Sequence, residues 1–493
     1  MQENNHLLTW MTFWPLIGAF IILCSPARAK EFIKQTALLF TIPSLICAVQ
    51  MLLQYDPHAS YQFVAKVPWI QTFHIYYYVG ADGLSVPMLF LTALLCPLCI
   101  LASWDIDDRA KGYFALFLIL ETGMLGVFIA LDFFLFYVFW EVMLLPMYFL
   151  IGIWGGPRRE YAAIKFFLYT LLGSVFLFIV MIVFYIYCDY SFDLTTLGAQ
   201  IAQSDLAGAT RLKWWLFLAM YIAFAIKIPA FPFHTWLPDA HVEAPTAISV
   251  ILAGILLKMG TYGLLRISYP LLPDMALAFA VPIALIALIN IVYGALVAMA
   301  QTDLKKLVAY SSISHMGFVM LGMAAMTPEG MNGAVMQMFS HGMITAMLFL
   351  LVGVIYDRAH HRDIDGFGGL AKNLPVYAGI TCVAFFAGLG LPGFSGFIAE
   401  VLVFLGAFGV YPWITILAAT SLVITATYLL WTYQRMFLGP LNEKYEALPD
   451  CTLREKATLY PLAVLVLLVG IFPQPVLNLF SPTLQRLIQL LGA

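Results

Sequence analysis

Charged side chains are scarce in this sequence. Lys and Arg number 24 and Asp and Glu number 27 among 493 residues, so 10% of the chain is charged, whereas 62% is hydrophobic and the mean hydropathy is +0.91. Soluble domains carry about 25% charged residues. The net charge of −3 gives no indication of nucleic-acid binding. This composition excludes an ordinary soluble protein and indicates a polytopic membrane protein.

The sequence also has few of the motifs that bind cofactors. It has no Gly-rich dinucleotide fingerprint and no cysteine spacing typical of a disulfide framework, a metal site or an iron–sulfur cluster. Cys96 and Cys99 form a C-x-x-C, but they lie inside an apolar run, where small apolar packing is the expected role. We therefore expect this chain to bind no metal and no cofactor.

Long apolar runs fill nearly the whole chain. A helix needs about 20 apolar residues to cross the roughly 30 Å hydrocarbon layer, and scanning at that length predicts an all-α protein with about fourteen transmembrane helices. The first run lacks a preceding basic segment and a small-residue cleavage site, so we expect a retained helix. The predicted spans lie near 7–26, 32–54, 80–104, 113–130, 133–153, 162–187, 213–238, 246–266, 276–300, 306–325, 330–356, 375–410, 412–437 and 459–479.

The distribution of Lys and Arg between the loops predicts the orientation. These residues concentrate in the loops that follow odd-numbered spans. Loops rich in Lys and Arg normally face the cytoplasm. The loops after even-numbered spans, with the C-terminal tail, hold only Lys66, Arg211, Lys213, Arg266 and Arg486. Both termini are therefore predicted on the non-cytoplasmic side.

Two predicted spans are interrupted in matching places. Pro229 and Pro232 interrupt the seventh span, because a helix cannot continue through such a pair without losing backbone hydrogen bonds. Pro392 and Gly393 interrupt the twelfth span within a Gly-rich stretch. Irregular backbone at membrane depth is tolerated only where protein or water covers it. Paired interruptions are typical of transport sites, and packing kinks are the alternative interpretation.

The positions of the breaks also predict internal repeats. Spans four to eight and nine to thirteen can form two inverted five-helix repeats, each with one broken helix. We expect three N-terminal transmembrane helices in 1–112, a first repeat in 113–266, a second repeat in 276–437, and a C-terminal loop with a final helix in 438–493.

Ionisable residues inside the predicted spans are the main indication of function. Each costs several kcal/mol in hydrocarbon unless it is paired or hydrated. At a rise of 1.5 Å per residue, most of them lie about 12–18 Å from the entry of their span, near the bilayer centre. For His315 and His341, a structural role and a role as a proton relay are equally well supported. The residues are Glu141, Lys227, Lys258, His315, His341 and Glu400, with Glu121 as an auxiliary candidate.

The chemistry available to these groups is proton transfer. A unit-charge pair 4 Å apart is worth about 4 kcal/mol at an effective dielectric of 20, and moving one charge through 100 mV takes about 2.3 kcal/mol. Separating Glu141 from Lys227 is therefore able to drive proton release. His234 and His241 lie in the proline-rich break and the loop after it, where capping or turn roles are expected.

Several motifs carry a resemblance to a known family. They are KIPAFPFHTWLPDAHVEAPTAISVILAGILLKMGTYG at 227–263, VGADGLSVPM at 79–88, FYVFWEVMLLPMY at 136–148, LVAYSSISHMGFVMLG at 307–322, FSHGM at 339–343 and GLPGFSGFIAE at 390–400. In order and spacing they resemble the antiporter-like, proton-conducting subunits of complex I. The likeness is to the subunit M family of bacterial NADH-quinone oxidoreductase and its mitochondrial counterpart, chain 4, and it covers almost the whole chain.

This resemblance implies a non-redox, proton-translocating subunit of a respiratory-chain translocase. Glu141 and Lys227 would form the ion pair of the first half-channel, and Lys258 would be the central proton carrier. The histidines would be polar linkers, and Glu400 would belong to the second half-channel. NADH, FMN, iron–sulfur clusters and quinone are expected on other subunits. Sister antiporter-like subunits are the expected partners, in a bacterial inner membrane.

Other functions fit the same pattern. A multi-subunit cation/proton antiporter would use the same helices and charges, and only ion dependence separates it from a redox-coupled pump. Hydrogenase-linked membrane subunits and the photosynthetic version of the complex share the expected architecture. A purely structural subunit is the third interpretation, and it predicts that Glu141→Ala and Lys258→Ala leave proton pumping intact.

Overall fold

The computed structural model describes residues 5–492, and helices dominate it. The first helices are α1 (Leu7–Cys24), α2 (Lys30–Gln54), α3 (Ser85–Ala102), α4 (Ala110–Ile129), α5 (Phe133–Val142), α6 (Leu144–Trp154), α7 (Arg159–Tyr187), α8 (Leu194–Gln203), α9 (Thr210–Lys227) and α10 (Trp236–Glu243). One continuous span follows, made of α11 (Thr246–Ile251), the π-helical turn η3 (Leu252–Leu256), α12 (Leu257–Gly263), the π-helical turn η4 (Leu264–Ser268) and α13 (Tyr269–Leu271). The remaining helices are α14 (Pro273–Met299), α15 (Leu304–Ala325), α16 (Pro328–Ala359), α17 (Pro375–Gly388), α18 (Ser395–Phe408), α19 (Pro412–Phe437), α20 (Leu453–Ile471) and α21 (Gln474–Leu491).

The chain is a polytopic membrane protein. Over the described residues, eleven helical spans are long and apolar enough to cross a membrane, or up to twelve if the bent pair of α20 and α21 counts as one span. The two other predicted spans, 213–238 and 375–410, correspond to the segments that contain the breaks: α9 with α10, and α17 with α18. The predicted total of fourteen spans and the inverted repeats stay predictions.

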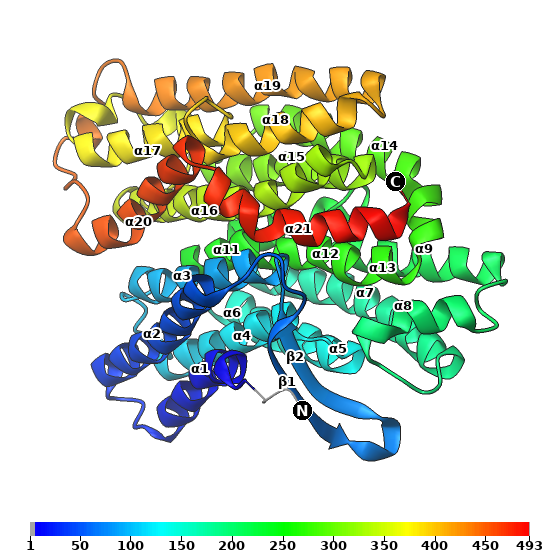
Figure 1. Ribbon diagram of the computed structural model, residues 1–493. Helices are drawn as coiled ribbons and strands as arrows, with labels where there is room; N and C mark the ends of the chain where they lie inside the picture. The colour runs from blue at the N-terminus through cyan, green and yellow to red at the C-terminus, as the bar shows by residue number, and fades with distance from the viewer. Residues whose placement is uncertain (1–4, 493) are drawn as a thin grey trace.

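A β-hairpin precedes α3, so the all-helical prediction is wrong for this segment. Strand β1 (Gln62–Ile70) pairs with β2 (Ile75–Ala81) in antiparallel register, with Ala65 opposite Val79. Aromatic and β-branched residues favour strands, and Tyr76, Tyr77 and Tyr78 are of this kind. Figure 1 shows the hairpin projecting beyond the helices of the first part of the chain.

The predicted final span, 459–479, is wrong in its second part. Helix α20 ends at Ile471, and α21 starts at Gln474 at an angle of 71° to it. Pro473 and Pro475 follow the end of α20, and proline removes a backbone donor and clashes with the preceding turn. Helix α21 is amphipathic and buries one apolar side that includes Phe480, Leu484 and Leu487.

Three spans form the centre of the molecule. Nearly all residues are buried in the most apolar stretches of Thr246–Leu271, α15 and α16. In Figure 1, α11, α12 and α13 lie between the blue and cyan helices of the first part of the chain and the yellow and orange helices of the last part. Helices α2, α7 and α19 instead keep large apolar side chains exposed, such as Leu39, Leu168 and Val423. The central spans are the ones that carry Lys258, His315 and His341.

Candidate functional site

Lys258 lies at a fully buried position of the candidate site. It belongs to α12, directly after the π-helical turn η3, and its side chain is fully buried. Its Nζ donates to the backbone oxygen of Ala253, 2.5 Å away, and contacts Nδ1 of His341 at 2.7 Å. π-Helical turns are often found at functional sites, because they alter the regular pairing of backbone groups. The lysine is thus held in direct contact with a second proton-binding group.

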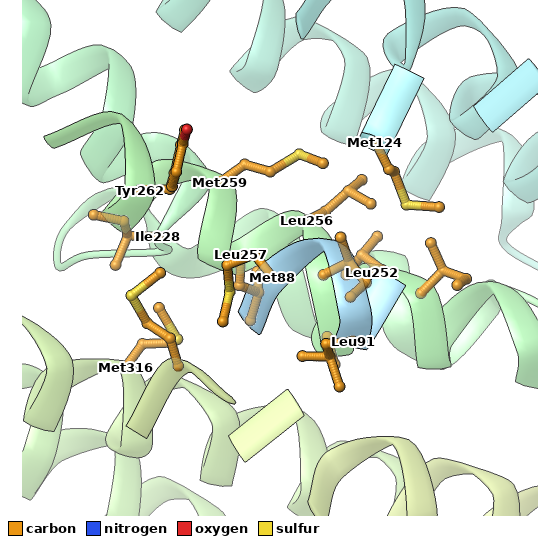
Figure 2. Packing of buried hydrophobic residues seen from close by; sticks show 14 of the residues in the cluster. Met88, Leu91, Met124, Ile228, Leu252, Leu256, Leu257, Met259, Tyr262 and Met316 are labelled. Atoms are coloured by element: carbon orange, nitrogen blue, oxygen red, sulfur yellow. The ribbon is translucent and has the colours of Figure 1, made fainter. Parts of the chain in front are cut away.

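The span around Lys258 is packed with apolar side chains. Figure 2 shows part of this packing, in which the labelled side chains are Met88, Leu91, Met124, Ile228, Leu252, Leu256, Leu257, Met259, Tyr262 and Met316. Leu257 and Met259, its neighbours in the chain, are fully buried like Lys258 itself. Low polarity strengthens electrostatic interactions, so the charge on Lys258 depends strongly on the few polar groups it contacts.

His341, His315 and Glu400 continue from Lys258 in a row. The rings of His341 on α16 and His315 on α15 lie 5.4 Å apart between centroids. Nε2 of His315 lies 3.7 Å from Oε1 of Glu400 on α18. All three side chains are buried. The structure therefore joins α12, α16, α15 and α18 through a continuous row of titratable groups, which we call the central row.

His315 has hydrogen-bond partners for both protonation states. When the ring is cationic, Nδ1 donates to the backbone oxygen of Ser311 at 2.8 Å and Nε2 donates to that of Gly388 at 3.0 Å. When the ring is neutral with its proton on Nε2, Nδ1 can accept from the hydroxyl of Ser311, whose Oγ lies 3.2 Å away. The hydroxyl of Tyr428 donates to the same Oγ at 2.8 Å. The surroundings of His315 thus suit a group that gains and loses a proton.

A small cavity adjoins the central row. It has a volume of about 10 Å³ and is lined by His315, His341, Gln337 and Glu400, among others. That volume is close to the minimum for one water molecule. Nε2 of His341 and Oε1 of Gln337 are buried and have no hydrogen-bond partner among the described residues. Gln337 is not among the residues predicted from the sequence, where its only signal is an amide four residues before His341 in an apolar span.

Lys227 is the last residue of α9 and contacts aromatic rings. Its side chain is buried, and Nζ lies 5.1 Å from the ring centroid of Trp140 and 5.7 Å from that of Phe166. Glu141, on α5, is only half-buried, and its Oε1 has no hydrogen-bond partner among the described residues. The predicted ion pair of Glu141 with Lys227 is not among the pairs within 4.0 Å in residues 5–492. In this structure the ammonium group is therefore held by aromatic faces.

Asn290, which is not among the residues predicted from the sequence, holds the break after α9. Pro229 and Pro232 lie between α9 and the short 3-10 helix η2 (Phe233–Thr235). Oδ1 of Asn290 on α14 accepts from the backbone N–H of Phe231 at 2.7 Å, and its Nδ2 donates to the oxygen of Pro229 at 3.1 Å. A lone amide in the apolar span 276–300 is the signal that could have found it.

The second break connects α17 with α18. Pro392 and Gly393 lie in this connection, and both Gly390 and Gly393 have positive φ, at 73° and 98°, which favours glycine. Oγ of Ser395, the first residue of α18, lies 2.6 Å from Oγ of Ser340 on α16. The connection therefore sits beside the central row, because Gly388 at its start is the partner of His315.

His241 is buried and differs from the expected capping residue. Its ring stacks on Phe349 of α16 with centroids 4.5 Å apart, and neither ring nitrogen has a hydrogen-bond partner among the described residues. A cavity of about 630 Å³ is lined by residues that follow His241 in the chain, such as Glu243 and Ala244, and by Lys305, among others. Nζ of Lys305 donates to the oxygen of Ala244 at 2.5 Å. His234, the other histidine of this region, contacts the hydroxyl of Tyr293 at 3.3 Å.

Glu121 on α4 is separate from the central row. It is fully buried, and neither carboxyl oxygen has a hydrogen-bond partner among the described residues. Cys96 and Cys99 on α3 are also buried and free. Within residues 5–492, no group of three or more His, Cys, Asp or Glu side chains could hold a metal ion.

Known families match nearly the whole chain. The family described as NADH:quinone oxidoreductase/Mrp antiporter, TM, matches residues 130–425, and the family described as NADH-ubiquinone oxidoreductase chain 4, amino terminus, matches residues 11–131. NADH-quinone oxidoreductase subunit M of Rhodobacter capsulatus is 43% identical over 98% of this chain and 97% of its own length. The chain belongs to the subunit M family. The resemblance found in the sequence motifs is thereby confirmed, and the NADH-ubiquinone oxidoreductase chain 4 of Chondrus crispus, 40% identical over 96% of each chain, is a further member of the same group of relatives.

Solved structures share the fold of this subunit M family member. A chain of respiratory complex I from Thermus thermophilus with bound NADH has a TM-score of 0.89 and 31% identity, covering 99% of this chain and 100% of that one. A chain of the Mrp complex from Dietzia sp. DQ12-45-1b has a TM-score of 0.85 and 22% identity, covering 100% of both chains. The second likeness concerns the fold alone.

Proposed function

We propose that this chain is a proton-translocating membrane-arm subunit of an NADH-quinone oxidoreductase. The observation that supports this most directly is the central row, Lys258, His341, His315 and Glu400, buried at the centre of a membrane protein. Buried ionisable groups in a membrane span are expensive, and mark ion or proton pathways where they are retained. The relatives also support this function. Those that match over nearly the full length are named NADH-quinone oxidoreductase subunit M and NADH-ubiquinone oxidoreductase chain 4.

The contacts of the central row suit stepwise proton transfer. Nζ of Lys258 and Nδ1 of His341 are 2.7 Å apart, within the 2.6–3.2 Å that proton transfer requires. Interactions between such groups are worth about 4 kcal/mol per charge pair at an effective dielectric of 20, close to the cost of moving one charge through about 200 mV. Changing the charge of one group therefore changes the proton affinity of the next.

A route into the row begins at the large cavity beside Lys305. The cavity lies where the predicted cytoplasmic loops meet, and the turn at Val242–Ala244 in its wall directly follows His241. The ring of His241 stacks on α16, the helix that also carries His341. We take His241 as the connection between this cavity and Lys258. Glu141 and Lys227 would serve the first half-channel, Glu400 the second, and Glu121 would be auxiliary.

The remaining features of the proposal concern the assembly and the membrane. The chain would have fourteen transmembrane helices, with inverted repeats in 113–266 and 276–437, and the break after α9 and the break after α17 would be equivalent positions. It would carry out no redox step. NADH, FMN, iron–sulfur clusters and quinone would be bound by other subunits, and sister antiporter-like subunits would be neighbours. The membrane would be the bacterial inner membrane, with both termini on the non-cytoplasmic side.

Proteoliposomes that contain the purified complex provide the test. Lys258→Met, which keeps the length of the side chain and removes its charge, is expected to reduce the number of protons pumped per quinone reduced to the background level. Lys372→Met, in the loop before α17, is the control and should leave this ratio unchanged. Normal pumping by an assembled Lys258→Met complex would contradict the proposal.

A cation/proton antiporter subunit is the second candidate, since the chain shares its fold with a chain of an Mrp complex. The two functions differ in what drives transport. An NADH-quinone oxidoreductase subunit requires quinone reduction by the complex and pumps protons without added Na⁺. Pumping that depends on a Na⁺ gradient and not on quinone reduction would support the antiporter.

A further inference from the structure

The ammonium group of Lys227 lies in an aromatic pocket, and the family resemblance gives the rings of this pocket no role. Its nearest ring partners are Trp140 of α5 and Phe166 of α7, at 5.1 Å and 5.7 Å from Nζ to the ring centroids. All three side chains are almost completely buried. A cation within about 6 Å of a ring centroid is attracted to the ring face, most strongly by Trp, and the attraction grows when water is excluded.

The pocket is held rigidly by its own contacts. Nε1 of Trp140 donates to Oγ of Ser174 on α7 at 3.1 Å. The indole stacks on Phe136, with centroids 5.9 Å apart, and meets Phe224 of α9 edge to face at 5.6 Å. Helix α7 thus supplies both Phe166 and the serine that fixes the indole. The ring face of Trp140 is therefore preorganised for the cation.

The backbone of Lys227 is fixed on both sides as well. Nε1 of Trp236 donates to the oxygen of Ile226 at 2.8 Å, before the lysine, and Nδ2 of Asn290 donates to the oxygen of Pro229 at 3.1 Å, after it. Oε1 of Glu141, by contrast, has no hydrogen-bond partner among the described residues. A switch between two partners of Lys227 would then take place in its side chain, because the backbone on both sides is held.

Most of the other charged and titratable groups near α9 already have partners. Glu141 on α5 is the charged group that acts on Lys227. The groups that pair elsewhere are Lys165 with Asp239, Lys258 with His341, His234 with Tyr293, Arg266 with Asp82, and Lys213 of α9 itself with Asp274. The hydroxyl of Tyr221 on α9 has no hydrogen-bond partner among the described residues. Lys227 is therefore left with Glu141 and the aromatic pocket.

We propose that Trp140, with Phe166, is the second partner of Lys227 and holds its ammonium group whenever the ion pair with Glu141 is open. Trp140 is a positioning residue in this scheme: it keeps Lys227 charged and in place without taking up a proton. Glu141, which is half-buried, is then free to interact with another group. The inference rests on the proposed proton-translocating function and adds the state that Lys227 occupies between ion pairs.

The test compares aromatic variants in proteoliposomes of the purified complex. Trp140→Leu keeps an apolar side chain and removes the ring, so the ammonium loses its partner and gives up its proton at lower pH. We expect the alkaline limb of the pumping profile to move down by about 1.5 pH units, which corresponds to about 30-fold in proton affinity. Trp140→Phe restores a weaker ring and should move the limb by less than half as much.

Two further measurements separate this role from packing. Phe139→Leu is the control, because Phe139 is the preceding aromatic on α5 and packs on Phe13, and it should leave the pH profile unchanged. Glu141→Gln combined with Trp140→Leu should reduce pumping by more than the product of the two single changes, because Lys227 then loses both partners. Trp140→Leu with an unchanged pH profile would overturn the inference.

A separate variant tests the role of Lys227 in the proposed function. Lys227→Ala is expected to lose pumping, and normal pumping in this variant would overturn the role of Lys227 itself. If Lys227→Ala loses pumping while Trp140→Leu retains the normal pH profile, the proton pathway stands and only the aromatic partner is wrong.

Discussion

The two states of His315 depend on one hydroxyl group. Both ring nitrogens face backbone oxygens, of Ser311 and Gly388, and these can only accept hydrogen bonds. The neutral ring therefore needs another donor for its unprotonated nitrogen, and Oγ of Ser311 is placed to be that donor. A buried acceptor without a donor costs about 1–3 kcal/mol, which would make proton release from His315 harder. At the scale of single residues, the proposed proton transfer through His315 would depend on such secondary contacts.

Ser311→Ala tests this arrangement. The variant keeps the backbone oxygen that serves the cationic ring and loses the donor that serves the neutral ring. We expect pumping at neutral pH to fall by about two- to tenfold, and the pumping profile to move to higher pH. Ser312→Ala is the control, since Oγ of Ser312 donates to the oxygen of Val308. Equal effects of the two variants, measured as protons pumped per quinone reduced, would show that the Ser311 hydroxyl has no special role.

At the scale of elements, the two helix breaks are held by residues from other helices. Asn290 of α14 binds the segment after α9, and Ser340 of α16 contacts Ser395 at the start of α18. Proline and glycine explain why the helices stop, but they do not explain where the free ends lie. The sequence predicted the positions of the breaks, whereas their partners come from helices that are distant in the chain.

Asn290→Leu is expected to loosen the first break. Leucine has a similar volume but leaves the N–H of Phe231 and the oxygen of Pro229 without partners, and each lost buried partner costs about 1–3 kcal/mol. The amide of Phe231 should exchange its hydrogen faster, and the thermal midpoint of the complex should fall. The control is Asn478→Leu, on the exposed side of α21, which should change the stability by less than about 0.5 kcal/mol. Unchanged exchange at Phe231 would exclude this role of Asn290.

The start of α17 provides a pH-dependent contact outside the membrane spans. Burial disfavours the carboxylate of Asp450, but the backbone N–H groups of Val376, Cys451 and Tyr377 outweigh it and hold the pKa of Asp450 below its ordinary value. A lowered pKa in the folded state means that the contact stabilises fully above the unfolded pKa of about 3.9. The stabilisation is lost as the pH falls through the lower, folded value.

Asp450→Asn should therefore matter at neutral pH and not in acid. At pH 7 we expect faster hydrogen exchange of the amides of Val376 and Tyr377 in the variant than in the unchanged protein. The difference should shrink as the pH falls below about 4 and disappear once the pH lies below the lowered pKa of the folded state, because Asp450 is then protonated in both the folded and the unfolded state. Asp205→Asn, at an exposed position, serves as the control. A difference that persists unchanged in strong acid would contradict the assignment.

At the scale of the whole molecule, α21 connects distant parts of the chain. Oγ of Ser481 donates to Oδ1 of Asn332, Oγ of Thr483 accepts from the N–H of Gly83, and Arg486 donates to the oxygens of His58 and Ala59. Its apolar side packs on α16, α13, α14 and α3. Helix α21 (red in Figure 1) thus lies across helices from both parts of the molecule.

Phe480→Ala should show how much α21 contributes to stability. Phe480 is fully buried, and truncating a buried phenylalanine to alanine costs about 3–5 kcal/mol. We expect a clear fall in the thermal midpoint of the purified complex. Leu490→Ala on the same helix removes an exposed side chain and should have an effect below about 0.5 kcal/mol. Similar midpoints for the two variants would mean that α21 does not depend on its buried side.

The sequence predicted the membrane class, most spans and both breaks, because these follow from local properties: apolar length, proline and glycine. It missed the β-hairpin at 62–81, since a hydropathy scan detects spans and not short strands. It also extended the final span beyond Ile471, because α21 is apolar enough on one side to resemble a continued helix. Errors thus occurred where hydropathy alone was used to assign structure.

The sequence by itself singled out the ionisable residues in its apolar segments, because burying charge in hydrocarbon is costly and charges there stand out. The tertiary structure alone decided which of them meet. Lys258, His341, His315 and Glu400 come from four different helices and form one row, whereas Lys227 faces Trp140 and Phe166 instead of pairing closely with Glu141. Contacts between distant segments depend on how whole helices pack, and packing involves every side chain at an interface.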